Sequence, residues 1–483
     1  MSAKTTIGWA VRDITPDRPV SLRGLFNLRI ATEVRDPLTL TALAVETGEE
    51  QTILVSMDSC AVNDEVLESV REALRERLPE FDPEHLIASA THTHTAPFSG
   101  GGPGLEKEED YHEDILAQYP EYMSIAEYTD LVVEAMTSAV CEAWESRAEG
   151  FIGWGLSYAV VGENRRVRYF DGRAEMYGDT SDPGFSHIEG HVDHCVNLLF
   201  TYDAGENLTG MVVNVACPSQ CSEGGQDFIS ADFWHDTREE ICRRHGEGVF
   251  ILPQCSASGD QSPHRQINAR AEDRMMVLKY GEGLSRRSNA GLRKDIARRL
   301  ADAIDDAEPA ARKELHDTVV HRHSFHVLEL THWDITDEEY ETASQEHVVH
   351  CEQLAAMDDT DALAADYTSM RTRVARCERV IERYEEPLES VSIEMSVVRL
   401  GDVAFVTAPF EYYLDFGDRI KGRSEALQTF VVQLAGGGTY LATERAAAGS
   451  SYGAVPASCR VSPEGGQMIV DQAVAIIGEM FAE

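Results

Sequence analysis

Residues 86–100, LIASATHTHTAPFSG, pass from five small or apolar residues into a polar loop that carries His92 and His94. The first five residues predict a short buried strand, and the Pro, Ser and Gly that follow predict a loop. Residues two apart in an extended chain share a face, so both imidazoles can project to one side. A metal site, a catalytic base and a polar turn are all consistent with this pattern.

Strand and helix patterns alternate along the chain on both sides of this stretch. Strand patterns cover residues 41–47, 51–59, 195–219, 248–263, 391–410 and 429–437. Helix patterns cover residues 63–79, 124–147, 230–246, 289–307 and 466–481. This alternation predicts an α/β fold with a mixed β-sheet core flanked by helices. In such folds the functional site lies on loops that follow strand ends.

Residues 334–387 differ from the rest of the chain, because they are highly charged, follow a helical pattern and contain few strand signals. We interpret them as a helical insertion and not as a separate domain. The sequence contains no internal repeat and no low-complexity linker. We therefore expect a single catalytic domain over residues 1–483.

Charge is the strongest compositional signal. The chain has 84 Asp and Glu against 42 Lys and Arg, which gives a formal net charge of −42. Six of the 42 basic residues are lysine, so 42 − 6 leaves 36 arginines. An acidic excess with little lysine is typical of salt-adapted proteins, in which counterions screen the self-repulsion. The same charge disfavours nucleic acid and anionic lipid as partners.

The location of the protein is predicted from segments that the sequence lacks. No apolar run approaches the roughly 20 residues of a membrane span. The N-terminal residues show no basic segment followed by an apolar one, as a secretory signal has. The ten cysteines are scattered and form no C-x-x-C motif, which favours reduced thiols. We expect a cytoplasmic protein of a salt-adapted cell, without stable membrane insertion; an oligomer is possible.

Four predicted strands end in loops with reactive side chains, namely His92, His94, Cys217, Cys221, Asp260, Ser262, His264 and Glu411. Imidazole, thiolate and carboxylate are ligands of zinc, and a catalytic zinc keeps one position open for water. Spacing alone favours neither a polar turn nor a metal site for the two histidines. For Cys217, Ser262 and Glu411, taken alone, it favours a small buried side chain, a turn serine and a solvated carboxylate.

Five segments occur in the order found in the neutral/alkaline, non-lysosomal ceramidase family. They are IGWAVRDITPD (7–17), SATHTHTAP (89–97), ENRR (163–166), GDQSP (259–263) and APFE (408–411). The chain resembles the catalytic domain of this family from residue 7 to about residue 455. T-H-T-H and G-D-x-S-P together carry most of the resemblance. The resemblance implies an amidohydrolase with one catalytic Zn²⁺ ion.

The resemblance also implies a set of zinc ligands. His92, the first histidine of T-H-T-H, matches one ligand, and Glu411 matches the carboxylate ligand. The family's late tyrosine ligand corresponds to Tyr452, with Tyr440 as the less favoured choice. Cys217 falls where the family has its second zinc histidine, and a thiolate is also a normal zinc ligand.

The cysteine at this position is a departure from the family pattern, and it leaves alternatives open. Gln220 or Cys221 can reach the metal instead, or the site has lost zinc. His191 and His194 are further candidate ligands, although they precede a predicted strand.

Four more residues carry catalytic roles by resemblance. Arg165 of ENRR matches an arginine that contacts substrate. Ser262 of G-D-x-S-P matches a serine that acts as nucleophile or as a hydrogen-bond partner of the transition state, and Asp260 belongs to the same motif. His94 is expected to face the substrate or to support a ligand. Proton transfer is then assigned to Ser262 and His94.

We therefore expect a zinc-dependent hydrolase that cleaves an amide (N-acyl) bond of a small-molecule or acyl-amide substrate by metal-activated water. Two alternatives remain: an esterase or a sugar-directed hydrolase or lyase on the same fold, and a metal-free binding protein that has lost activity. The family's C-terminal β-sandwich is not expected within 483 residues. An acidic chain without an amphipathic membrane segment is also poorly suited to a lipid surface.

Overall fold

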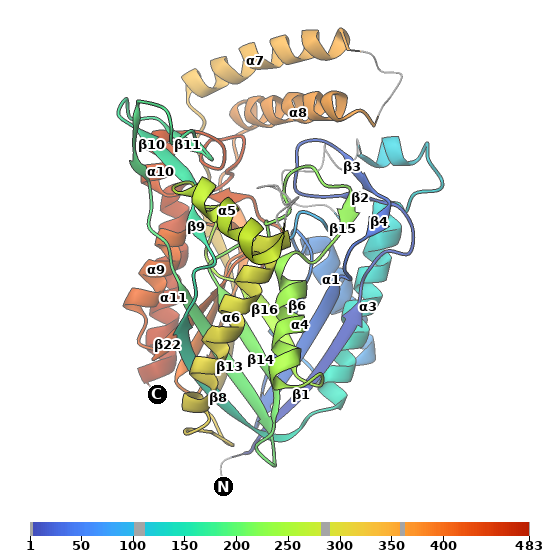
Figure 1. Cartoon of the computed structure of the whole chain (residues 1–483), viewed down its shortest axis with the longest axis vertical. Helices are drawn as coiled ribbons and strands as arrows, with labels where there is room; N and C mark the ends of the chain where they lie inside the picture. Colours follow the sequence, from blue (N-terminus) through green and yellow to red (C-terminus); the bar gives the residue numbers. More distant parts are fainter. Residues whose placement is uncertain (1–2, 101–111, 282–289, 358–362, 483) are drawn as a thin grey trace.

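The computed structural model describes residues 3–100, 112–281, 290–357 and 363–482 (Figure 1). Its largest element is an eight-stranded sheet with the order β16-β14-β13-β8-β1-β5-β6-β7. The strands are β1 (Thr5–Asp13), β5 (Thr39–Thr47), β6 (Glu50–Met57), β7 (Leu86–Ala90), β8 (Ala148–Tyr158), β13 (Cys195–Asp203), β14 (Leu208–Val215) and β16 (Phe250–Cys255). The pairs β6–β7 and β14–β16 are parallel and the other pairs are antiparallel, so the predicted mixed sheet is confirmed.

A second, four-stranded sheet packs face to face on the first. It has the order β18-β19-β20-β22, with β18 (His321–Leu330), β19 (Val391–Leu400), β20 (Val403–Thr407) and β22 (Gln428–Val432). Leu43 and Leu199 of the large sheet share one apolar cluster with Val398, Phe405 and Phe430 of the small sheet. The sequence predicted a sheet core but not its division into two sheets, because strands buried on both faces show no alternation that assigns each face.

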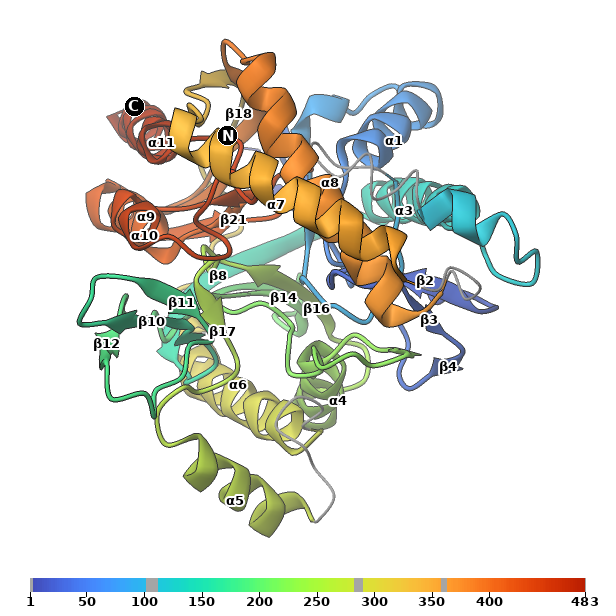
Figure 2. The same cartoon turned by 90° about the horizontal axis from the view of Figure 1, so that it is seen from above.

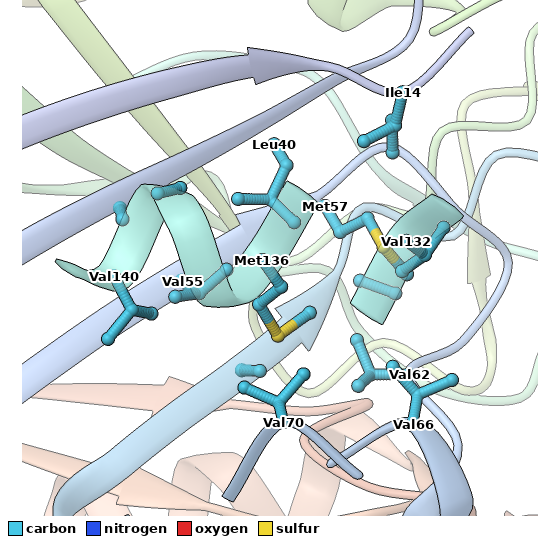
Figure 3. Packing of buried hydrophobic residues seen from close by; sticks show 14 of the residues in the cluster. Ile14, Leu40, Val55, Met57, Val62, Val66, Val70, Val132, Met136 and Val140 are labelled. Carbon is cyan, nitrogen blue, oxygen red and sulfur yellow. The ribbon is translucent and has the colours of Figure 1, made fainter. Parts of the chain in front are cut away.

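Helices cover the two outer faces, and the molecule has four layers: helices, sheet, sheet, helices (Figure 1). The large sheet is covered by α1 (Asp64–Arg77), α3 (Ile125–Glu145), α4 (Phe233–His245) and α6 (Ala290–Ala311), and the small sheet by α9 (Leu414–Arg423) and α11 (Pro463–Ala482). Figure 3 shows Val66 and Val70 of α1 and Met136 of α3 packed against Val55 and Met57 of β6.

The described part of residues 334–387, which were predicted to be a helical insertion, contains two helices. These are α7 (Asp337–Ala355) and α8 (Ala365–Glu385), which lie side by side across one end of the molecule (Figures 1 and 2). Thr336 and Glu339 form a capping box that begins α7. Among the described residues, no helix is long and apolar enough to span a membrane.

Short elements complete the described part of the chain. They are β2 (Val20–Leu22), β3 (Arg29–Ala31), β4 (Glu33–Val34), η1 (Pro83–His85), β9 (Glu163–Asn164), β10 (Arg166–Tyr169), β11 (Ala174–Met176), β12 (Phe185–Ile188), β15 (Phe228–Ile229), β17 (Gln261–Ser262), α5 (Ala269–Tyr280), β21 (Glu411–Tyr412), β23 (Tyr440–Leu441) and α10 (Glu444–Gly449). Of these, β21 and β23 position the candidate site, because they pair in parallel with Glu411 directly opposite Tyr440.

Candidate metal and catalytic site

A cavity of about 160 Å³ lies where the loops after β6 and β7 meet β21, β23 and α8. Its volume is below the roughly 300–1,000 Å³ of pockets for drug-sized ligands. The wall includes Cys60, His92, His94, Glu411, Tyr440 and Tyr452. A site on loops beyond strand ends was predicted from the sequence, and this cavity has that position.

His92 is held in an unusual backbone conformation. Its φ is +64°, a left-handed value that is uncommon for a residue other than glycine. The neighbouring peptides fix the loop, because Thr91 N donates to Met57 O at 3.0 Å and Thr93 N donates to Ser59 O at 3.1 Å. Such strain persists where the surroundings over-determine it, often at functional sites.

The ring of His92 is oriented by one nitrogen and leaves the other for chemistry. Nδ1 donates to the carbonyl oxygen of Cys60 at 2.6 Å, so Nδ1 carries the proton. Nε2 lies 3.3 Å from Oε2 of Glu411. Apart from each other, these two buried atoms have no hydrogen-bond partner among the described residues. Two ligands at zinc bond lengths and a tetrahedral angle stand about 3.3–3.5 Å apart, which matches this spacing.

The charges of His92 and Glu411 stabilise each other. Burial disfavours the charged form of His92, but the charges of Glu411 and Cys60 outweigh it and raise the pKa of His92 well above its ordinary value. Burial likewise acts to raise the pKa of Glu411. The charges of His92 and Arg165, together with the adjacent ring of His92 and hydroxyl of Tyr440, outweigh that effect, and the pKa of Glu411 is lowered. Without a metal, both shifts favour the ion pair of His92 and Glu411 over the neutral pair.

His94 is neutral and receives a hydrogen bond from Gln220. Burial first, and then the positive charges of His92 and Arg29, lower the pKa of His94 well below its ordinary value. Gln220 Nε2 lies 2.8 Å from His94 Nε2, while Gln220 Oε1 accepts from Arg165 Nη1 at 3.3 Å. A guanidinium only donates, so it fixes the amide with its nitrogen toward His94. The proton of His94 is therefore on Nδ1, which has no hydrogen-bond partner among the described residues.

Arg165 lies behind the ligand pair and joins it to the rest of the site. Its Nη2 is 3.6 Å from Glu411 Oε2 and donates to the hydroxyl of Tyr440 at 3.2 Å. The same nitrogen donates to Gly259 O at 2.9 Å, and Nη1 donates to the hydroxyl of Tyr177 at 3.2 Å. No motif in the sequence pointed to Tyr177.

Ser262 and Asp260 lie behind Arg165 and are not among the described residues that line the cavity. Ser262 Oγ accepts from the hydroxyl of Tyr177 at 3.0 Å and from the peptide N–H of His264 at 3.1 Å. Asp260 accepts from Asn164 Nδ2 at 2.7 Å and from the peptide N–H of Leu414 at 3.0 Å. The structure therefore links Ser262 to Arg165 through Tyr177, while Asp260 anchors the start of α9.

The structure places Cys217 away from the cavity wall. Its thiol packs in the apolar cluster between the large sheet and helices α4 and α6, and Sγ donates to Pro218 O at 3.4 Å. Burial raises the pKa of Cys217, and also that of Cys221, well above the usual thiol value. His191 instead pairs with Asp418 at 2.8 Å, and neither His191 nor His194 lines the cavity.

Cys60 is the cysteine that the structure brings to the site. Ligand atoms of Cys60, His92 and His94 all lie within 4.8 Å of one another, a group that can hold a metal ion. Sequence reasoning missed Cys60, although a signal was present. It follows β6, the parallel neighbour of β7, and the ends of parallel strands meet at one edge of a sheet.

Of the two candidate tyrosines, Tyr440 lies directly beside Glu411. Tyr452 lines the cavity further out, with 38% of its surface exposed and its ring at 74° to that of Tyr440, 5.4 Å between centroids. The ligand and catalytic roles implied for all these residues remain predictions.

No family model and no curated protein sequence matches this chain. Its fold nevertheless matches solved structures of ceramidases. A neutral ceramidase from Pseudomonas aeruginosa aligns with a TM-score of 0.69 and 17% identity, over 99% of this chain and 75% of that chain. A structure described as ceramidase complexed with C2 aligns with a TM-score of 0.70 and 15% identity, over 99% and 76%. The chain therefore has the fold of the neutral ceramidases.

Proposed function

We propose that this protein is a metal-dependent hydrolase that cleaves an N-acyl amide bond. The carrying observation is the contact between His92 Nε2 and Glu411 Oε2, two buried atoms 3.3 Å apart with no other hydrogen-bond partner among the described residues. The ceramidase fold and the resemblance of the short motifs support the same class of reaction.

The donor set fits zinc. Imidazole nitrogen and carboxylate oxygen are its usual ligands, and the phenol of Tyr440 lies beside them. We assign His92, Glu411 and Tyr440 as the residues that would hold the ion. The amide of Gln220 is not a usual zinc ligand, and its contacts with His94 and Arg165 already use both of its ends. When bound, the ion supplies a polarised substrate carbonyl and a water of lowered pKa.

The surrounding residues orient the proposed ligands and stabilise charge on the substrate. Arg165 keeps Glu411 ionised and aims the hydroxyl of Tyr440, because it contacts both. His94 presents an N–H at Nδ1 without a protein partner, and we assign this group to donate to the substrate oxygen as negative charge develops there. Ser262 already accepts two hydrogen bonds behind Arg165, so we assign it to positioning Tyr177 and assign the attack to water.

Metal analysis combined with turnover tests this proposal. Wild type and Glu411→Gln are purified in high salt, their zinc content is determined, and hydrolysis of a short N-acyl amide and of its ester analogue is followed. We expect about one zinc per chain and amide cleavage in wild type, and neither in Glu411→Gln. Glu444→Gln removes the same charge from the exposed first turn of α10 and should behave as wild type.

One observation favours a second candidate, a metal-free binding protein. The guanidinium of Arg165 lies 3.6 Å from the same Glu411 oxygen and there provides the positive charge that a metal would provide. Wild-type protein without metal and without amide or ester turnover, whose stability is unchanged by chelator, would establish this candidate and refute the hydrolase.

A further inference from the structure

Among the described residues that line the cavity, basic side chains outnumber acidic ones, although the chain as a whole is strongly acidic. The whole protein has a formal net charge of −42, yet three arginines line the cavity, Arg23, Arg376 and Arg379. Glu411 is the single carboxylate among the described lining residues, and in the proposed function it binds the metal. An acidic protein that concentrates guanidinium groups around a small cavity has a local field that attracts anions.

Arg376 is held in place without a carboxylate. Its guanidinium carbon lies 5.2 Å from the ring centroids of both Phe26 and Tyr452, and Nη2 donates to Ser458 Oγ at 2.9 Å. Among the residues that the structure describes, no carboxylate forms an ion pair with Arg376. Aromatic faces and a hydroxyl orient a guanidinium but leave its charge uncompensated.

Arg23 has the same property deeper in the wall. It is 7% exposed, and its Nη1 donates to Asn63 Oδ1 at 3.0 Å. Arg29 Nη2 donates to the carbonyl oxygens of both Arg23 and His94, at 2.7 and 2.9 Å, and so fixes this part of the wall next to the site. Within the described ranges, Arg23 pairs with no carboxylate either. A buried guanidinium without a counter-charge is costly, and an anionic ligand removes that cost.

We propose that the cavity recognises a small N-acyl amide that carries an anionic group, carboxylate or phosphate, close to the bond that is cleaved. The inference rests on the proposed function and adds the substrate class. Guanidinium forks match both anions, while Leu25 and Phe98 supply apolar wall for a short acyl chain. In the reaction the C–N bond breaks, the acyl carbon takes the oxygen of water and leaves as a carboxylate, and the leaving nitrogen takes up both protons of that water and departs as an ammonium. High salt screens the repulsion between the acidic surface and the substrate.

A matched pair of substrates tests the proposal on the wild-type protein. N-Hexanoylglycine carries a carboxylate, and N-hexanoylglycinamide is its neutral analogue; N-hexanoyl-phosphoethanolamine provides the phosphate arm. We expect kcat/KM for one of the two anionic substrates to exceed that for the neutral amide by at least about tenfold. The preferred substrate then shows whether the site takes a carboxylate or a phosphate. Equal turnover of all three, or a preference for the neutral amide, would overturn the proposal.

Variants of α8 assign the preference to the cavity arginine. Arg376→Gln should reduce the preference to about threefold or less through KM, and Arg376→Lys should keep part of it. Arg373→Gln, an exposed position on the same helix, should leave the preference unchanged. A preference that Arg376→Gln leaves intact would contradict the assigned site.

Calorimetric binding separates failure of this inference from failure of the proposed function. Wild type and the inactive Glu411→Gln variant are titrated with N-hexanoylglycine and with the glycinamide. Binding that favours the anion and depends on Arg376, without any hydrolysis by wild type, would support the anion site and refute the hydrolase. Hydrolysis of both substrates without discrimination in turnover or binding would retain the hydrolase and refute the anion site.

Discussion

Two neighbouring loops carry predicted zinc ligands, and the structure uses them differently. One follows β7 and carries His92; the other follows β14 and carries Cys217. The loops touch, because Ser219 N donates to Thr91 O at 3.1 Å. Yet the ring of His92 faces the cavity, while the thiol of Cys217 packs into an apolar cluster.

The difference follows from what each side chain can satisfy when it is buried. An imidazole has two nitrogens, so His92 donates one N–H to Cys60 O and keeps the other nitrogen for Glu411. A thiol has one weak donor and otherwise behaves as a small apolar group, and Cys217 lies among such groups. Of these two residues, the one with a polar partner at each ring nitrogen faces the cavity, and the thiol among apolar side chains does not.

Replacement of His92 should affect metal binding and activity more than any other single change. His92→Ala should lose the bound zinc and lower amide hydrolysis by at least about 1,000-fold, since the metal supplies several kcal/mol to the reaction. Metal analysis and steady-state kinetics on the same sample measure both effects. His187→Ala, at an exposed position of β12, serves as the control. Full zinc occupancy in His92→Ala would contradict the ligand assignment.

His321 is a buried histidine away from the cavity, and its shifted pKa makes the stability of the fold depend on pH. His321 Nε2 lies 2.9 Å from Thr52 Oγ1, and burial, with the charges of His85 and Arg322, lowers the pKa of His321 to about 3. The unfolded chain takes up this proton near pH 6.5, so His321 costs stability as the pH falls from about 6.5 toward 3. At pH 4.5, about two units below the unfolded-state pKa of roughly 6.5, His321 lowers the free energy of unfolding by roughly 2.5 kcal/mol.

Denaturant unfolding of wild type and His321→Gln at pH 7.5 and 4.5 measures this cost. The acid-induced loss of unfolding free energy should be smaller in the variant by that amount, while titration of the many carboxylates is common to both proteins. Amide turnover at pH 7.5 should not change. If wild type and His321→Gln lose the same free energy of unfolding between pH 7.5 and 4.5, then unfolding does not change the protonation of His321.

Much of the fold was predictable from local patterns. The hairpin of β5 and β6, helix α3 and the helical character of residues 334–387 follow from periodicity, turn residues and caps. The pairing of two sheets was not predictable, because β20 and β22 are apolar on both faces and such runs do not state which neighbour each face meets. Strand β18 was also missed, because only two of its ten residues are buried and three of them are histidines.

The candidate site was predictable by position but not by side-chain direction. Motif order singled out the segments with His92 and Glu411, and these two side chains meet in the cavity, while their roles as ligands stay a prediction. Near Cys217 the same reasoning indicated the loop but not the side chain that faces the site. In the structure, Gln220, three residues after Cys217, contacts His94. Which side chain of a loop turns inward depends on partners from distant segments, such as Arg165, that the local sequence does not contain.

In the loop after β14, replacement of Gln220 should have an effect on activity between those of replacing His92 and Cys217. Gln220→Ala removes the donor that holds His94 Nε2, so the ring gains freedom and its proton is no longer confined to Nδ1. We expect kcat to fall about tenfold, or about 1.4 kcal/mol, with zinc content unchanged. Kinetics with metal analysis decide the point. Zinc loss in this variant would show that the amide, and not only His94, supports the metal.

Replacement of Cys217 should have the smallest effect on zinc content and activity. Cys217→Ala should keep about one zinc per chain and hydrolyse amides within about twofold of wild type, because the thiol contacts apolar neighbours and a carbonyl, not the cavity. Its cost should appear in stability, as about 1 kcal/mol of unfolding free energy for the small void it leaves. Cys221→Ala, in the same cluster, should show the same pattern. Loss of zinc in Cys217→Ala alone would mean that the thiol turns toward the metal, and the two loops would then contribute ligands equally.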